Sequence, residues 1–282
     1  MALLAAAPLA PPASAFQTNP PGEARPAAEA KPAGEPEPTR KTRNVVLCII
    51  DGLRWQEVFT GADETLFNET AGKIKNDRYV RDTYWRATPE QRRETLMPFF
   101  WSVVAKNGIV YGDRARNAPG RVANEYSVSY PGYLETFCGF HEPLIKDNRR
   151  IMNPHVTVFE WLNGMKEYNG RVAAFTTWDL FPWIFNVERS KLPVDDGIQP
   201  CKFGRITPRI EFINRLRAET PRRWSGSHFD SMAFHVMMEW VEVNRPRVLF
   251  FGQGETDEWA HETDYERYLD AAKRTDQYWK EL

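Results

Sequence analysis

The sequence predicts an α/β fold, a mainly parallel sheet with helices on both faces, and two observations lead to it. Residues 45–50 and 248–251 are continuous apolar runs that end in glycine-containing turns. Runs of this kind are typical of strands buried on both faces of a parallel sheet. Segments with helical spacing alternate with such runs along most of the chain, which is the order that helix-covered parallel sheets require.

The first half of the chain is expected to place short helices around the first strand. Hydrophobic spacing predicts a helix over residues 96–106, and the Asn107-Gly108 pair that follows suits its C-terminal cap. A further short helix, a polar connecting stretch and a short strand are expected at residues 53–59, 60–93 and 109–112, respectively.

The second half is expected to alternate more regularly between helix and strand. Helices are predicted over residues 157–168 and 208–218, with a strand over 171–177 between them. A long helix is then predicted to precede the second apolar run, and another helix is predicted to follow it. Each of these connections is long enough to join neighbouring parallel strands.

Capping boxes are expected to start these last two helices. In such a box, the side chains of the first and fourth residues each bond to the other's backbone N–H. Ser227 and Asp230 are expected to form the first box, and Thr263 and Glu266 the second.

Residues 1–40 are expected to lie outside the folded domain. The start of the chain is a short apolar stretch, and Ala13-Ser14-Ala15 fits the small-residue cleavage site of a signal peptide. Residues 17–40 are rich in Pro, Ala and Glu, a composition typical of disordered linkers. The sequence therefore predicts a periplasmic or secreted protein with one α/β domain over residues 41–282.

Composition excludes several classes of function. The 282 residues carry a formal net charge of −1, so no global field attracts nucleic acid. No apolar segment reaches the length needed to span a bilayer. The three cysteines, Cys48, Cys138 and Cys201, form neither a disulfide framework nor a zinc-finger spacing. A small-molecule substrate is therefore the expected partner.

Acidic residues follow both apolar runs. Asp51 comes directly after the first run, and Asp257 follows the second, with His261 four residues later. Ligands of open α/β sheets bind at the carboxyl ends of the strands, so these side chains are expected at one edge. Carboxylate and imidazole groups are common zinc ligands. The pattern predicts a metal site, although Asp51 alone also suits a plain helix cap.

A hydroxyl group is expected at a helix N-terminus between these two strands. Ser129 precedes Tyr130-Pro131, and the proline suits the first turn of a helix that continues to Cys138. Free backbone N–H groups and the helix dipole favour an anionic substrate there. Ser129 is therefore the predicted nucleophile, and Ser127, two residues earlier, is the alternative.

These motifs resemble the alkaline phosphatase superfamily, and within it the nucleotide pyrophosphatase/phosphodiesterase branch. That branch has an Asp after the first strand, a Ser or Thr nucleophile before aromatic-Pro, and a later Asp-x-x-x-His. The resemblance covers residues 44–282 and implies an alkaline phosphatase-like fold with two zinc ions. It makes Asp51 and Ser129 ligands of one ion, and Asp257 and His261 ligands of the other.

The resemblance implies a metal-dependent hydrolase of phosphate esters, preferably phosphodiesters, that forms a covalent intermediate on Ser129. Two departures accompany it. The family's Asp-His pair after a further strand and its distal His have no counterpart here, so the chain is expected to be C-terminally incomplete and to bind zinc weakly. Gly132 stands where an Asn that contacts phosphate is expected.

Three other readings remain open. A sulfatase would share the superfamily fold, but Tyr133 occupies the position of the Arg in its modification motif. A cofactor-independent phosphomutase is a further relative. A non-catalytic binding protein with an incomplete site is the alternative from another class. Asp179, Glu255 and Glu258 are expected to belong to a turn and a solvated loop rather than to the site.

Overall fold

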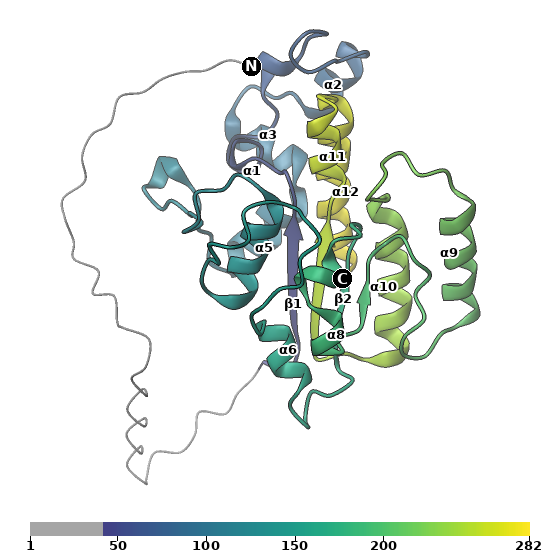
Figure 1. Ribbon diagram of the computed structural model, residues 1–282. Coiled ribbons are helices and arrows are strands. Elements are labelled where there is room, and N and C mark those ends of the chain that lie inside the picture. Colours follow the sequence, from purple (N-terminus) through teal and green to yellow (C-terminus); the bar gives the residue numbers. More distant parts are fainter. Residues whose placement is uncertain (1–41) are drawn as a thin grey trace, which may run out of the picture. The chain divides into compact units, whose positions relative to one another are not determined.

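The computed structural model describes residues 42–282, and the expected signal peptide and linker at residues 1–40 lie outside the described residues. A four-stranded sheet forms the centre of the described domain (Figure 1). Its strands are all parallel and follow the order β1-β4-β2-β3. They are β1 (Val45–Ile50), β2 (Val172–Phe175), β3 (Val194–Asp195) and β4 (Val248–Gln253). The predicted α/β class with a parallel sheet is confirmed.

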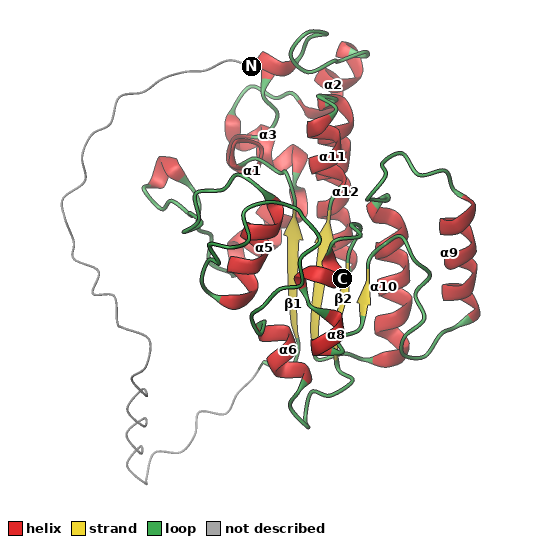
Figure 2. Cartoon of the chain, viewed as in Figure 1, coloured by secondary structure: helices red, strands yellow, loops and turns green. Residues whose placement is uncertain are grey.

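Helices occupy most of the connections between the strands (Figure 2). Before β2 they are α1 (Trp55–Thr60), α2 (Asp77–Tyr84), α3 (Pro89–Leu96), α4 (Ala105–Asn107), α5 (Ser129–Cys138) and α6 (Val158–Asn163). After β2 they are α7 (Phe181–Ile184), α8 (Val187–Ser190), α9 (Pro208–Glu219), α10 (Asp230–Asn244), α11 (Glu255–His261) and α12 (Tyr265–Glu281). None of the helices in residues 42–282 combines the length and apolar character needed to cross a membrane.

Helices cover both faces of the sheet, as predicted. Val248 and Phe250 of β4 pack into a hydrophobic cluster with side chains of α5, α6 and α7. The alternate residues Leu249 and Phe251 pack on the other face with side chains of α9 and α10. All six residues of β4 are buried, because successive side chains of a strand point to opposite faces. This burial explains the unbroken apolar run in the sequence.

A third hydrophobic cluster holds α11 beyond the carboxyl ends of β1 and β4. Trp259 of α11 and Leu269 of α12 pack in it with Val80 of α2 and Leu96 of α3. Segments far apart in the sequence therefore support one helix. The packing fixes α11 beside the end of β1 (Figure 1).

Residues 60–112 differ most from the sequence-based expectation. The polar stretch contains α2 and α3, the latter started by a capping box of Thr88 and Gln91 with Pro89 at the first helical position. These signals are present in the sequence, so the expectation of a plain polar connection over residues 60–93 is wrong. Residues 109–112 form no strand and have irregular backbone.

The single helix expected over residues 96–106 is divided into three segments. α3 ends at Leu96, a π-helical turn spans Phe100–Val104, and α4 follows. The backbone N–H groups of Phe99 and Phe100 each donate to the carboxylate of Asp276, at 2.7 Å. This contact with α12 takes up N–H groups that a regular helix would use internally, so a tertiary interaction overrides the local spacing.

Both predicted capping boxes are wrong. α10 begins at Asp230 after Phe229, which provides no side-chain cap. The carboxylate of Asp230 accepts instead from the backbone N–H of Gly254, at 2.9 Å. α12 begins at Tyr265 and is capped by Asp264 rather than Thr263. Ser227 is thereby released from a capping role.

Candidate functional site

Asp51 stands where the two long strands end together. β1 and β4 pair in register, with Ile50 opposite Gln253, and the backbone N–H of Asp51 donates to the carbonyl of Gln253 at 2.9 Å. This confirms the prediction that the two apolar runs are neighbours. Gly52 follows with a positive φ of 69°, and a Cβ atom on it would lie 2.4 Å from the Cα of Asp257. Only glycine allows this close approach.

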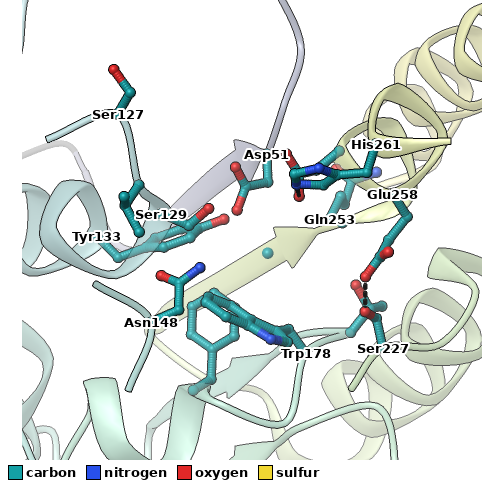
Figure 3. Close-up of a pocket in the computed structure, with 16 residues that line it drawn as sticks. Asp51, Ser127, Ser129, Tyr133, Asn148, Trp178, Ser227, Gln253, Glu258 and His261 are labelled. Carbon is teal, nitrogen blue, oxygen red and sulfur yellow. Dashed lines mark hydrogen bonds and ion pairs between the residues drawn. The ribbon is translucent and has the colours of Figure 1, made fainter. Parts of the chain in front are cut away.

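Ser129 is the first residue of α5, as predicted. Val128 before it is extended and serves as the N-cap. The hydroxyl groups of Ser129 and, one turn later, of Tyr133 lie near the carboxylate of Asp51 and lower its pKa. Ser127, the alternative nucleophile, is exposed and lies apart from Asp51 in Figure 3. The geometry therefore favours Ser129.

Asp257 and His261 lie one turn apart on α11. The Nε2 atom of His261 is 3.3 Å from Oδ2 of Asp257. His261 is 77% exposed at its side chain, whereas Asp257 is 31% exposed. Figure 3 shows His261 beside Asp51 at the carboxyl edge of the sheet. The four residues chosen from the sequence thus meet at one cavity, as expected from the strand-then-acid pattern.

The cavity has a volume of about 430 Å³ and lies over the ends of β1 and β4 (Figure 3). Trp178 and Phe181 contribute aromatic surface to it. No Lys or Arg of the described residues lines it. Its polar side chains are Asp51, Ser127, Ser129, Tyr133, Asn148, Thr177, Ser227, Gln253, Asp257, Glu258 and His261.

Burial perturbs both aspartates. Desolvation raises the pKa of Asp51, opposed by the nearby hydroxyl groups of Ser129 and Tyr133 and by the N–H of Gly52. Desolvation and the nearby charge of Asp51 together raise the pKa of Asp257 to about 6. The carboxylates of Asp51 and Asp257 therefore lie close together, and His261 is the one nitrogen-bearing basic side chain among the cavity-lining residues described. This environment suits a bound cation.

Asn148 is a functional candidate that sequence reasoning missed. Its Oδ1 accepts from the backbone N–H of Tyr130 at 3.0 Å, and its amide group points into the cavity near Ser129 (Figure 3). Gly132, where the family pattern has an Asn, lines not this cavity but an adjoining hollow that shares Asp51, Ser129 and Asp257 with it. A lone Asn in an irregular segment carries no pattern, so only the fold could reveal it.

The donor set fits zinc in kind but not in number. Within residues 42–282 there is no group of three or more His, Cys, Asp or Glu side chains placed to hold one metal ion. Asp51 with Ser129, and Asp257 with His261, provide two donors each, whereas a catalytic zinc takes three protein ligands and an open position. The described residues at the cavity therefore offer fewer donors than a catalytic zinc takes.

Three acidic residues set aside in the sequence have defined places. Asp179 forms an ion pair with Arg150 at 2.5 Å, in keeping with a structural turn. Glu255 and Glu258 belong to α11, so the expected solvated loop is wrong. Glu255 is buried and pairs with Arg274 at 2.9 Å. Glu258 lines the cavity.

Comparisons with known proteins do not name a relative. No protein-family model, no curated protein and no solved structure matches this chain. The family resemblance therefore rests on the motifs at Asp51, Ser129 and Asp257 with His261. The arrangement of these residues at the cavity is therefore the basis for the proposed function.

Proposed function

We propose that this protein is a zinc-dependent hydrolase of phosphate esters, with phosphodiesters as its preferred substrates and Ser129 as its nucleophile. One observation carries the proposal. The hydroxyl of Ser129 lies at a helix N-terminus beside the half-buried strand-end carboxylate of Asp51, and an Asp–His pair lines the same cavity. Nucleophile and electrophile-binding groups in one cleft are the arrangement that covalent ester hydrolysis needs.

The charge of the cavity supports a metal requirement. A phosphodiester is an anion, yet the carboxylates of Asp51 and Asp257 line the cavity without Lys or Arg. Such a site repels phosphate unless cations neutralise the carboxylates. Zinc held by Asp51 and Ser129, and by Asp257 and His261, would supply that charge and lower the pKa of the Ser129 hydroxyl.

The residues of the chain have separate roles in the reaction. Oγ of Ser129 attacks phosphorus while the ester P–O bond breaks, and the proton lost by Ser129 ends on the departing alcohol. The carboxylate of Asp51, which lies beside the Ser129 hydroxyl, would orient it before attack. The amide of Asn148 donates to a phosphoryl oxygen, where negative charge is stabilised. Water then attacks phosphorus, the bond between phosphorus and Oγ of Ser129 breaks, Oγ regains a proton, and the phosphate monoester leaves.

The test compares Ser129→Ala with Ser127→Ala in the full chain, loaded with zinc. Turnover of bis-p-nitrophenyl phosphate, p-nitrophenyl phosphate and p-nitrophenyl sulfate is measured side by side. Ser129→Ala should lower kcat by on the order of 10⁴-fold, whereas Ser127→Ala should change it by no more than about twofold. Loss of activity in Ser127→Ala with retention in Ser129→Ala would reassign the nucleophile. Faster turnover of the sulfate ester would make the protein a sulfatase.

Metal dependence is tested separately by chelation. Dialysis against EDTA should abolish hydrolysis, and added Zn²⁺ should restore it, because the site has carboxylates but no Lys or Arg to hold the anionic substrate. Circular dichroism of the metal-free protein checks that the fold persists. Full activity after exhaustive chelation would overturn the metal requirement.

A further inference from the structure

The wall of the cavity opposite Ser129 is formed by Glu258, Ser227 and Trp178 (Figure 3). These residues come from three elements: α11, the segment before α10, and the segment after β2. The proposed phosphoryl chemistry uses none of them. These side chains are therefore free to bind a part of the substrate other than its phosphate group.

The segment with Ser227 is fixed against the end of β2. Ser227 and Trp178 form an antiparallel β-bridge. The backbone N–H of His228 donates to the carbonyl of Thr177 at 3.0 Å, and that of Asp179 donates to the carbonyl of Gly226 at 2.9 Å. The positions of Ser227 and Trp178 in the wall are consequently set by backbone hydrogen bonds.

Glu258 faces the cavity with one neutral partner. Its Oε1 accepts a hydrogen bond from the hydroxyl of Ser227, which is 3% exposed. No Lys, Arg or His of the described residues forms an ion pair with Glu258, whereas Glu262 on the next turn pairs with Arg223 at 2.5 Å. A half-buried carboxylate without a cation favours a ligand that brings one.

Glu258 is also separate from the proposed metal ligands. It follows Asp257 directly, so on a helix the two side chains point about 100° apart. Within the described part of the chain, Asp257, His261 and Glu258 do not form a three-residue metal group. The charge of Glu258 is therefore left for the substrate.

Trp178 adds a second feature that attracts cations. Its indole lines the cavity together with Phe181, and their rings meet edge to face with centroids 6.0 Å apart. The face of an indole attracts ammonium groups, most strongly when they are shielded from water. An aromatic face and an unpaired carboxylate on one wall form a pair of features that recognises an organic cation.

We propose that Glu258, Ser227 and Trp178 form a subsite for a protonated or quaternary amine, and that the preferred substrates are phosphodiesters of amino alcohols. This inference rests on the proposed function for the phosphodiester, while the ammonium subsite itself does not depend on hydrolysis. Glu258 neutralises the ammonium charge, Ser227 holds the carboxylate toward the cavity, and Trp178 covers the alkyl groups of the amine.

Binding is tested first, because it needs no turnover. Choline and its uncharged isostere 3,3-dimethylbutanol are titrated into the full chain and followed by ligand-observed NMR. The wild-type protein should bind choline at least about tenfold more tightly than the alcohol. Glu258→Gln should remove this preference, and the matched control Glu262→Gln on the same helix should keep it. Equal binding of choline and the alcohol by the wild-type protein would overturn the subsite.

Turnover provides the second test, with the leaving group held constant. The substrates are p-nitrophenyl phosphorylcholine and p-nitrophenyl 3,3-dimethylbutyl phosphate. Glu258→Gln should lower kcat/KM by about tenfold for the cationic ester and leave the neutral ester within about twofold. An equal loss on both esters would give Glu258 a structural or metal-binding role instead. Retained turnover of both esters by Ser129→Ala would refute the hydrolase mechanism without affecting the binding result.

Discussion

Two aspartates, Asp51 and Asp195, end strands at the same edge of the sheet but have opposite surroundings. Asp195, the last residue of β3, accepts two hydrogen bonds from Arg217, at 2.8 and 3.1 Å, and both side chains are fully buried. Asp51, by contrast, has only the hydroxyl groups of Ser129 and Tyr133 and the backbone N–H of Gly52 near its carboxylate as neutral donors. Burial raises the pKa of both carboxyl groups, and only that of Asp195 is opposed by a guanidinium.

The difference shows that a strand-end position does not by itself make an aspartate functional. The carboxylate of Asp195 is already neutralised inside the protein, so it has a structural role. The carboxylate of Asp51 opens into a cavity lined by no Lys or Arg of the described residues, so it can bind an external cation. The following predictions test this division, beginning with the largest effect.

Exchanging each aspartate for asparagine should separate function from stability. Asp51→Asn should lower kcat of the zinc-loaded enzyme by on the order of 10³-fold or more, because the amide cannot balance a metal charge. Its free energy of unfolding without metal should change by less than about 1 kcal/mol. Urea unfolding and hydrolysis of bis-p-nitrophenyl phosphate measure the two quantities. A greater loss of kcat in folded Asp195→Asn would contradict the comparison.

Arg217→Ala should destabilise the protein by about 3–5 kcal/mol, because it leaves Asp195 buried and unpaired. Urea unfolding followed by circular dichroism provides the measurement. The double variant Asp195→Leu/Arg217→Met is the control and should recover most of the loss, since it removes both charges. If the single variant lost less than about 1 kcal/mol, the pair would not be the structural counterpart of Asp51.

Asn148→Ala tests whether the side-chain amide near Asp51 donates a hydrogen bond to the phosphoryl group. Removing one preorganised donor to a phosphoryl oxygen lowers kcat by about 10²-fold, while binding of the metal should stay unchanged. Steady-state kinetics and zinc titration report the two effects. Gly132→Asn is the informative companion, because it restores the amide expected from the family pattern at a position facing another hollow. It should not rescue Asn148→Ala.

Asp230 is a third buried aspartate and an intermediate case. Burial and the adjacent Glu255 raise its pKa to about 8. Arg274 pairs with Glu255, and Tyr133 and Tyr278 also lie near. The folded protein therefore holds a proton that the unfolded chain releases near pH 4. Stability should fall as the pH rises from about 4 to about 8, by at most about 1.4 kcal/mol per pH unit.

The control for this pH dependence is Asp230→Asn, which cannot ionise. Urea unfolding at a series of pH values should give a flatter profile for Asp230→Asn than for the wild-type protein. Stability that rises with pH across the same window in the wild-type protein would show that Asp230 is ionised in the folded state.

The sheet and the four candidate residues could be predicted because local patterns determine them. The apolar run at residues 248–251 is buried in the central strand β4, whereas the run at residues 45–50 forms the edge strand β1, which is only partly buried, and Asp51 follows it directly. Ser129 was placed correctly because Pro131 marks the helix start. β3, with two residues, is too short to produce a periodic pattern.

Other parts of the site depend on contacts that no local pattern encodes. Ser227 has the residue type and spacing of a helix cap, yet its hydroxyl bonds to Glu258 across the cavity. Asp230 leaves its predicted cap because the N–H of Gly254 competes for its carboxylate. Each of these side chains has several possible hydrogen-bond partners, and which partner it takes depends on contacts between segments far apart in the sequence. Such contacts can be identified only from the folded structure.

The absence of a side chain at residue 52 has a consequence for the spacing of the whole centre. The strand end that carries Asp51 and the helix that carries Asp257 touch through backbone atoms at Gly52, so no adjustable side chain separates them. The proposed pair of zinc ions would require a separation of about 4 Å. Gly52 thus sets the distance between Asp51 and Asp257, and a single methyl group at residue 52 would move these two carboxylates apart without replacing either.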